Sequence, residues 1–368
     1  MEAIKNIVNW LSGPTVLFTL ATVGFFVSLK YKQMWSKKSG LVMLAGMVVF
    51  YVLSLFDSDF VAIVAKPDNV PITFVLFMVG YFTWLSMHQA TENDNRIAND
   101  EPVLEKQEED KVWVWPDLVY VEMLCMVLLT IGLMVWSILL QAPLEQPANP
   151  ADSPNPSKAP WYFLGLQEML VYFDPWLAGV VYPTLIIVGL MAIPYIDTNP
   201  KGNGYFTFKE RKAEIAIFLY GFLILWTLLV ISGTFLRGPN WNFFGPYEYW
   251  DTHRVEPLLN VNVSDFFWVK MLNRPLPANP FVREFLGVIV ILVYVFALPV
   301  LMAAPREKLP GFLRWMSLHK YYEKMGPPRY YLGVSLFLLM LSLPIKMYLR
   351  WFFNLKYIVA FPEIFFNI

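Results

Sequence analysis

The sequence predicts an all-α, polytopic membrane helix bundle with about eight transmembrane helices. Apolar residues make up 57% of the 368 residues and charged residues only 15%, whereas an ordinary soluble domain is about a quarter charged. The chain also contains several apolar runs close to the roughly 20 residues that a helix needs to cross a hydrocarbon core about 30 Å thick. Because backbone polar groups cannot be left unpaired in lipid, we expect these runs to be helices rather than strands.

Eight apolar runs give the expected order of the transmembrane helices. They cover residues 14–29, 41–56, 71–87, 118–140, 177–195, 214–236, 284–303 and 330–349. The first three runs are the shortest. The amino-terminal stretch MEAIKNIVNWLSGPTVLFTL lacks a clear small-residue cleavage site, so we expect a retained anchor rather than a cleaved signal.

The lysine and arginine residues in the loops predict the orientation in the membrane. The loops 30–40, 88–117, 196–213 and 304–329 hold 4, 3, 4 and 6 basic residues, and the opposite set, 1–13, 57–70, 141–176, 237–283 and 351–368, holds 1, 1, 1, 5 and 1. The first set should face the cytoplasm. Both termini and the stretch KAPWYFLGLQEML (158–170) are therefore expected on the outer, positive side.

Three regions are expected along the chain. Residues 1–90 form a three-helix N-terminal membrane extension, residues 91–112 an acidic cytoplasmic linker, and residues 113–368 the remaining membrane domain. The linker contains ENDNRIANDEPVLEKQEED, with eight acids and two bases, and is expected to be solvated. The loop 141–160 has six prolines in twenty residues and is expected to be extended or turning.

Several chemistries are excluded by counts and motifs. A net charge of −1 without a basic tract indicates no nucleic-acid partner. The lone Cys125 cannot form an internal disulfide or a cysteine-ligated metal site. His88, His253 and His319 fall at expected helix ends or in loops, so no pair should sandwich a haem, and we expect neither haem nor metal on this chain alone. Phosphate-loop, HExxH and serine-elbow motifs are absent from the sequence.

The region from about Trp113 to Phe244 resembles the carboxy-terminal half of cytochrome b, called subunit IV where it is a separate chain in cytochrome bf-type complexes. WPDLVYVEML is similar to the entry into the first carboxy-terminal helix of that family. QAPLEQPANPADSPNPSKAPWYF resembles the loop that runs into the Pro-Glu-Trp-Tyr motif of the outer quinol site, and AGVVYPTLIIVGLMAIPYID resembles the next helix. The resemblance covers a third to a half of the chain and does not include residues 1–90.

The resemblance implies a haem-free membrane subunit of a cytochrome bc-type quinol:cytochrome c, or other electron acceptor, oxidoreductase that translocates protons. It implies quinol and quinone as substrates and no activity for the chain alone. Haem b and an iron–sulfur cluster would belong to partner subunits, namely a dihaem cytochrome b N-terminal-type chain and a Rieske protein, with a c-type cytochrome as a further partner. The complex would be a dimer in an energy-transducing membrane, the bacterial cytoplasmic membrane.

The predicted outer quinol site departs from the family motif. Ala159 and Pro160 precede Trp161 and Tyr162, so proline stands where the family has the glutamate thought to take a proton from quinol. Pro160, Trp161 and Tyr162 are expected to form walls of the outer site, with Tyr162 close to the reaction. Interfacial anchoring of the two aromatic rings is the alternative.

Glu168 is the candidate that replaces the missing acid. If a helix starts near Pro160, then Trp161, Gly165, Glu168 and Tyr172 lie on one stripe. Quinol oxidation releases protons, so a base in a poorly hydrated pocket is useful there. We therefore predict Glu168 as the outer-site proton acceptor. In the alternative, its carboxylate reaches water or pairs with a basic residue of a partner subunit.

Asp117 and Glu122 are the candidates for the inner quinone-reduction site. Asp117 is placed to cap a helix that starts at Leu118. The resemblance implies instead that an acid at this position supplies a proton to the inner quinone pocket. Glu122 lies about one turn further inside, where an acid is costly and is expected to be functional or paired.

Two classes of function remain open from the sequence. The first is the haem-free subunit described above. The second is a haem-free quinone-binding anchor of another respiratory redox complex, or a transporter-like membrane subunit. The outer loop GTFLRGPNWNFFGPYEYWDTHR (233–254) is expected to be an interfacial aromatic belt or a docking platform for a partner.

Overall fold

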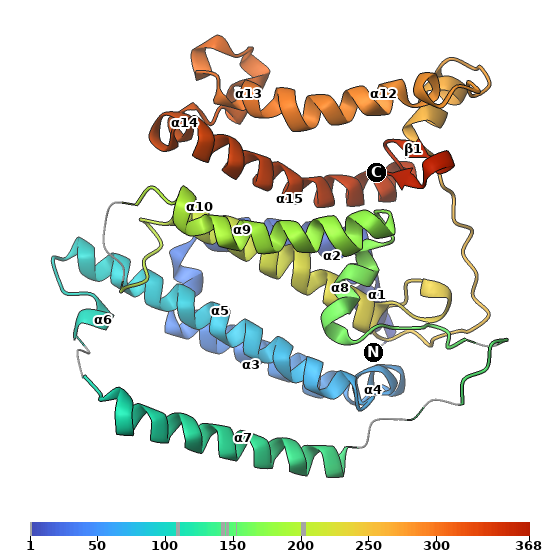
Figure 1. The fold of residues 1–368 in the computed structure, drawn as a ribbon. Coiled ribbons are helices and arrows are strands. Elements are labelled where there is room, and N and C mark those ends of the chain that lie inside the picture. Colours follow the sequence, from blue (N-terminus) through green and yellow to red (C-terminus); the bar gives the residue numbers. More distant parts are fainter. Residues whose placement is uncertain (1, 108–110, 141–143, 145–146, 152, 200–203) are drawn as a thin grey trace. The chain divides into compact units, whose positions relative to one another are not determined.

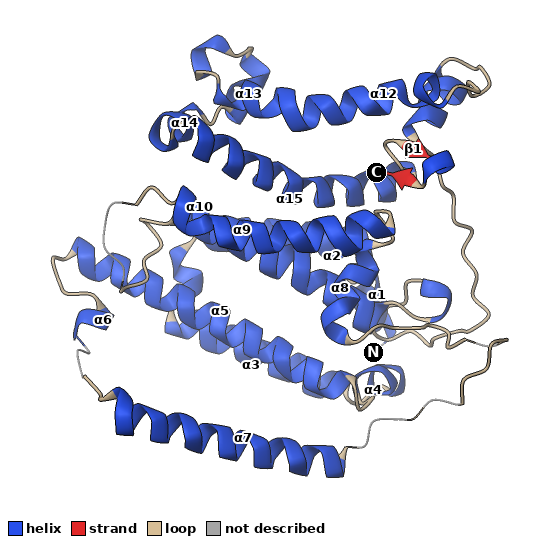
Figure 2. Cartoon of the chain, viewed as in Figure 1, coloured by secondary structure: helices blue, strands red, loops and turns tan. Residues whose placement is uncertain are grey.

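The computed structural model describes residues 2–107, 111–140, 144, 147–151, 153–199 and 204–368. Most of these described residues are helical. Within the described residues, β-structure is limited to the antiparallel pair β1 (Ala360–Phe361) and β2 (Phe366–Asn367), together with a few isolated bridges (Figure 2). The all-α prediction is therefore confirmed.

The described residues contain seven helical segments that are long and apolar enough to cross a membrane (Figure 1). They are α3 (Lys37–Ser54), α5 (Asn69–Ala98), η2 with α7 (Val114–Leu118, Val119–Leu139), η3 with α9 (Leu177–Val181, Tyr182–Ile196), the run of α10, η4, α11 and η5 (Lys212–Leu219, Tyr220–Thr227, Leu228–Ile231, Ser232–Leu236), the run of α12, η8 and α13 (Pro280–Leu292, Val293–Ala297, Leu298–Ala303), and α15 (Pro327–Phe353). An eighth span is formed if α1 (Glu2–Leu11) and α2 (Pro14–Lys30), which are bent by 75° at Gly13, count as one. The polytopic prediction is confirmed.

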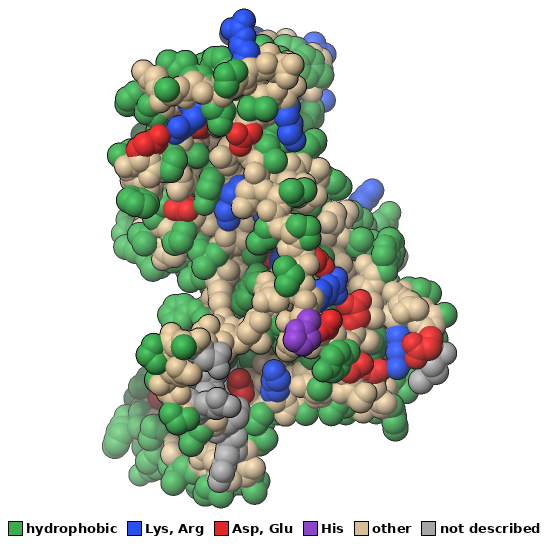
Figure 3. All heavy atoms as spheres, turned by 90° about the vertical axis from the view of Figure 1, so that its right-hand side faces the viewer, with side chains coloured by type: hydrophobic (Ala, Val, Ile, Leu, Met, Phe, Trp, Pro, Cys, Tyr) green, Lys and Arg blue, Asp and Glu red, His purple; other side chains and the backbone are tan. Residues whose placement is uncertain are grey.

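Short helices connect these spans. They are η1 (Lys32–Trp35), α4 (Ser58–Val64), α6 (Leu104–Gln107), α8 (Trp161–Met169), η6 (Pro239–Trp241), η7 (Asp265–Met271), η9 (Arg306–Lys308), η10 (Gly311–Met316), α14 (His319–Met325) and η11 (Pro362–Ile364). Hydrophobic side chains cover much of the face drawn in Figure 3, as expected for a surface that meets lipid or other membrane helices.

The chain forms two compact units. Unit 1 comprises Met1–Ser157, Gly202–Ala216 and Thr234–Arg254, and unit 2 comprises Lys158–Lys201, Ile217–Gly233 and Val255–Ile368. Unit 1 thus joins the predicted extension 1–90 to parts of the predicted domain 113–368. This division reflects packing alone, and the sequence boundaries at 90 and 112 stay a prediction.

In unit 1 the helices of the extension pack closely. Gly40 of α3 faces the Trp84 ring of α5, and a Cβ at Gly40 would lie 2.1 Å from that ring. Asp57 begins α4 by accepting the backbone N–H of Phe60 at 2.9 Å, and it pairs with Lys5 at 2.6 Å. Burial raises the pKa of Asp57, but the hydrogen bonds from Lys5 and Phe60 and the Lys5 charge outweigh this and hold it below its usual range.

The prediction that the acidic segment 91–112 is wholly solvated is wrong for its first residues, which belong to helix α5. The helix continues to Ala98, so it includes residues that the sequence assigned to the linker. Asn93 is completely buried and Asp94 is 3% exposed. Their partners come from distant positions, which local charge density does not reveal. Residues 108–110 of the linker lie outside the described residues.

Unit 2 is built around α8, the middle of the Lys212–Leu236 run, and α15. Gly165 of α8 lies against Trp226 and Val230, at 3.7 and 3.3 Å from its would-be Cβ. The hydroxyls of Tyr182 in α9 and Ser342 in α15 form a hydrogen bond. Further along α15, the core contains Met302, Tyr330, Val334 and Leu338.

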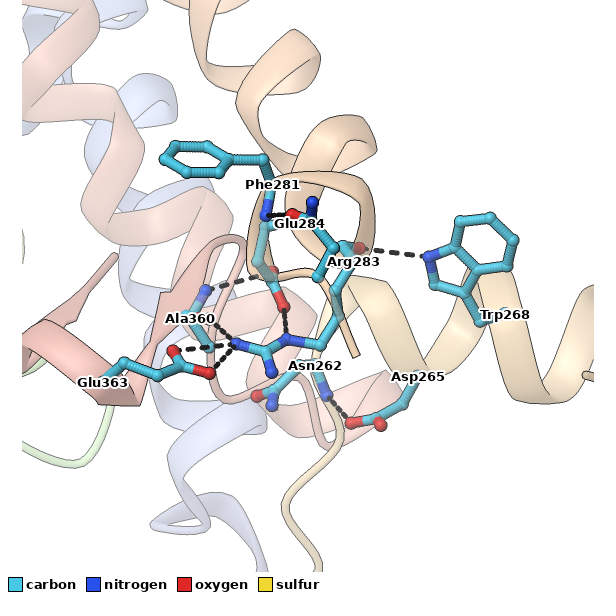
Figure 4. A network of polar contacts seen from close by, with 9 residues as sticks. Asn262, Asp265, Trp268, Phe281, Arg283, Glu284, Ala360 and Glu363 are labelled. Atoms are coloured by element: carbon cyan, nitrogen blue, oxygen red, sulfur yellow. Dashed lines mark hydrogen bonds and ion pairs between the residues drawn. The ribbon is translucent and has the colours of Figure 1, made fainter. Parts of the chain in front are cut away.

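The carboxy-terminal segment closes onto the start of α12 (Figure 4). The buried Glu284 accepts the backbone N–H of Ala360 at 3.1 Å and the Arg283 Nε–H at 3.0 Å. Arg283 also pairs with Glu363 at 3.1 Å. Next to this network, a Cβ at Gly287 would lie 2.0 Å from the carbonyl oxygen of Ile358. Only glycine therefore allows this segment to lie against α12.

Candidate functional site

Helix α8 starts where the sequence predicted it. Pro160 precedes the first helical residue, Trp161, and its carbonyl accepts the N–H groups of Phe163 and Leu164 at 2.8 and 3.2 Å. The Gln167 side chain accepts the backbone N–H of Ala159 at 2.8 Å, which fixes the turn into the helix. The described part of the preceding proline-rich loop contains no helix, as expected, although residues 141–143, 145–146 and 152 lie outside the described residues.

The two ends of α8 differ in exposure. Trp161 and Tyr162 are 41% and 49% exposed, whereas Glu168 is 1% exposed. The Tyr172 hydroxyl, also buried, lies 3.5 Å from Glu168 Oε1. Because Glu168 is enclosed by its own unit, the alternative in which its carboxylate reaches water is wrong. The predicted stripe therefore begins in an open region and ends at a carboxylate shielded from bulk water.

Basic side chains on and after α15 lie around the segment that follows α8. Lys346 is 1% exposed, its Nζ lies 5.6 Å from the Phe173 ring, and it has no hydrogen-bond partner among the described residues. One turn along, Arg350 donates to the carbonyls of Leu259 and Asn354 at 2.9 and 3.0 Å. The apolar pattern did not predict this group of basic residues, although a lysine inside the predicted span 330–349 was the available signal.

Two further groups complete this polar region. Lys356 donates to the carbonyl of Leu170 at 3.3 Å, and burial, with the Arg350 charge, lowers its pKa. The Tyr357 hydroxyl donates to Asp174 at 3.0 Å, and burial, with this hydrogen bond, raises the pKa of Tyr357 to about 12. Tyr357 therefore stays protonated and can donate a hydrogen bond throughout the physiological pH range.

The inner-site candidates lie on a helix that is exposed throughout. Trp115 has extended φ and ψ angles, so the helix proper begins after it, and Asp117 lies inside the first turn and makes no capping hydrogen bond. The predicted capping role is therefore wrong, because the chain becomes helical earlier than Leu118. Asp117 and Glu122 are both exposed, and neither carboxylate has a partner among the described residues. α7 has no buried residue.

The histidines need one correction. His88 lies within α5 rather than at a helix end, with its ring stacked on Trp84 at 5.4 Å and its Nδ1 2.8 Å from the carbonyl of Trp35. The sequence missed this because the helix extends beyond the predicted span 71–87. Among the described residues there is no group of three His, Cys, Asp or Glu side chains that could hold a metal ion.

The outer loop in unit 1 is tied to the end of the proline-rich loop. Asn155 and Asn240 form two hydrogen bonds: the Asn155 side-chain amide donates to the Asn240 side-chain oxygen at 2.9 Å, and the Asn240 backbone N–H donates to the Asn155 side-chain oxygen at 2.7 Å. Asn240 has a φ of 57°, a conformation that asparagine tolerates better than most residues.

α8 and the larger part of both loops lie in a stretch that matches a known family. The family model for cytochrome b(C-terminal)/b6/petD matches residues 147–245. This part of the chain belongs to the cytochrome b C-terminal family. No solved structure matches the chain. The match includes Pro160, Trp161, Tyr162 and Glu168. It ends before α15, so Lys346, Arg350 and Lys356 lie outside it. The match therefore shows a cytochrome b C-terminal-type region of 99 residues within the 368-residue chain.

Proposed function

We propose that this protein is the haem-free membrane subunit of a cytochrome bc-type quinol:electron acceptor oxidoreductase. The observation that carries the proposal is a buried carboxylate on α8, inside the residues that match the cytochrome b C-terminal family. The electrons would pass to a c-type cytochrome through partner subunits, and protons would be released on the outer side of the bacterial cytoplasmic membrane.

At the outer site, Glu168 is the proton acceptor. Oxidation of a quinol removes two electrons and two protons, so a base close to the hydroxyl group lowers the barrier. Glu168 is shielded from bulk water, and Tyr172 lies near enough to relay a proton from it. Pro160, Trp161 and Tyr162 form the wall on which the ring of the quinol packs, with Tyr162 beside the reacting hydroxyl.

At the inner site, Asp117 and Glu122 supply protons to quinone. An exposed acid near the end of an apolar helix is costly in lipid unless another group pairs with it. We infer that a partner chain covers this part of α7 and completes the pocket. The partner expected here is the dihaem cytochrome b chain, which would contribute the haems that this subunit does not bind.

A Glu168→Gln variant tests the outer-site role. In the assembled complex, we expect quinol oxidation per haem to fall by about 10²-fold or more, because general base catalysis typically contributes that much. Glu168→Asp should recover part of the rate. Glu284→Gln, which alters an equally buried carboxylate in the same unit, is the control and should keep its rate per haem. An unchanged rate and pH profile in Glu168→Gln would contradict the role.

Expression with and without a partner tests the assembly. The chain purified alone should show no visible haem absorbance and no quinol oxidation, and both should appear on co-expression with a four-helix dihaem chain. Haem absorbance in the chain purified alone would contradict the proposal. Co-purification with a molybdenum subunit and no dihaem partner would support the alternative, a quinone-binding anchor of another redox complex.

A further inference from the structure

The N-terminal extension holds the outer loop of unit 1. The backbone N–H of Tyr247 donates to Asn9 Oδ1 at 3.0 Å, and the Tyr247 hydroxyl lies 2.6 Å from Ser54 Oγ. The Tyr247 ring lies 5.8 Å from the ring of Phe60. A Cβ at Gly245 would lie only 2.5 Å from Asn9 Cγ. We call Asn9, Ser54 and Phe60 the outer contact, and it fits this loop only when residue 245 is glycine.

A second set of residues in the extension holds the loop that precedes α10. Asp94 accepts hydrogen bonds from Lys32 Nζ and from the backbone N–H of Lys209, both at 3.0 Å. The Asn93 side chain donates to the carbonyl of Phe206 at 3.0 Å. We call Lys32, Asn93 and Asp94 the inner contact. Because Asn93 and Asp94 are buried and paired, breaking the inner contact leaves buried polar groups unsatisfied.

The two contacts lie toward opposite ends of α5, a helix long and apolar enough to cross a membrane. Ser54 and Phe60 precede α5, whereas Asn93 and Asp94 lie in its last turns. The 30 residues of this helix correspond to a length of about 45 Å at 1.5 Å per residue, which exceeds the hydrocarbon core. The two loops that they hold border the same membrane segment along the chain, Lys212–Leu236.

Such contacts are what a specific helix association in lipid requires. Apolar faces alone give little preference for one neighbour, because lipid tails are as apolar as leucine side chains. The extension instead contacts each loop through part-buried hydrogen bonds and, at Gly245, through a close fit. These contacts select one position for the extension.

We propose that the three N-terminal helices are an internal brace, a built-in subunit that fixes the outer loop 237–250 and the inner loop 204–211 at the two ends of the Lys212–Leu236 segment. The brace does not depend on quinol chemistry, so it goes beyond the function proposed above. It gives the extension, which the family match does not cover, a positioning role.

A cleavable full-length chain tests the brace. A site for a sequence-specific protease is placed after Gln107, and the purified protein is cut in mild detergent. The fragments should co-elute, because both contacts are non-covalent and join residues on either side of the cut. Fragments that separate at once without a mutation would overturn the proposal.

Variants at the outer contact make the test specific. Gly245→Ala should speed fragment separation on warming by about tenfold or more, whereas Gly132→Ala, whose Cβ would meet no atom within 4 Å, should leave it unchanged. Asn9→Gly removes the clashing atoms, so the double variant should lose less than the sum of the two single losses. Equal effects of Gly245→Ala and Gly132→Ala, or strict additivity, would overturn the outer contact.

A variant at the inner contact covers the case in which Gly245→Ala does not fold. Asp94→Asn keeps the shape of the side chain and removes the charge that pairs with Lys32. It should also speed separation of the cut fragments, and Glu92→Gln, an acid on the same helix that is 44% exposed in its side chain, should not. Equal rates for these two variants would overturn the brace. None of these measurements involves haem or quinol. Their outcome therefore tests the brace independently of the proposed redox function.

Discussion

Replacing Lys346 with methionine should stabilise the protein. The ammonium group is buried, has no hydrogen-bond partner among the described residues, and lies in a segment that spans the membrane. Insertion scales put a lysine at the centre of a membrane helix at about 2.5–3.5 kcal/mol unfavourable. The cation–π interaction with the Phe173 ring, 5.6 Å away, offsets about 1–2 kcal/mol of this cost. The net gain from Lys346→Met is therefore about 0.5–2.5 kcal/mol, because methionine still fills the space of the lysine stem.

Thermal unfolding of the purified protein in detergent measures this gain. A gain of about 0.5–2.5 kcal/mol corresponds to a rise of roughly 1–10 °C in Tm, at the 2–4 °C per kcal/mol typical of larger domains. Lys356→Met is the matched control, because the ammonium of Lys356 donates to the Leu170 carbonyl, and its loss should give no rise. A fall in Tm for Lys346→Met would refute the reasoning, since it would mean that the charge is compensated. A rise in Tm with a loss of quinol oxidation would show that the charge is retained for activity.

Three further outcomes follow from the geometry. Gly287→Ala should destabilise the protein by about 3 kcal/mol or more in a thermal melting assay, because the new methyl group overlaps backbone rather than a movable side chain. The control is Gly189→Ala, which places a methyl group in open space within α9. In the same assay it should be neutral or stabilising by about 1 kcal/mol. Arg283→Leu leaves the buried Glu284 without its cation and should cost about 3–5 kcal/mol in denaturant titration; a loss below about 1 kcal/mol would show that the backbone N–H of Ala360 suffices. The lowered pKa of Asp57 means that its contribution to stability is present above about pH 4 and is lost as the pH falls through the folded pKa. Tm should therefore fall less steeply with acid in Asp57→Asn than in the wild type, and parallel curves would argue against this linkage.

The membrane spans were predictable because lipid leaves the backbone few choices. The run 177–195 became η3 and α9, from Leu177 to Ile196, since an apolar stretch of this length must pair its peptide groups within itself. The start of α8 was predictable for a local reason as well. Proline at position 160 has no N–H to lose and is tolerated at the beginning of a helix.

Other features depend on contacts that are remote in sequence. The end of α5 reads as a solvated acidic segment, and the burial of Asn93 and Asp94 arises only when Phe206 and Lys209 supply partners. The buried position of Lys346 was not predicted, because one charge does not lower the mean hydropathy of a long apolar run enough to interrupt the predicted span. In both cases a polar residue had its role set by a distant segment, which periodicity cannot reveal.

The chemistry of α8 also depends on residues outside the family match. The matched residues, 147–245, contain Glu168, but the cations nearest to the segment after α8 come from α15 and the residues that follow it. In the outer-site role proposed above, positive charge at this place would favour the release of a proton that Glu168 accepts. The residues that match the family thus hold the candidate acid, and residues outside the match place positive charge near the segment that follows it.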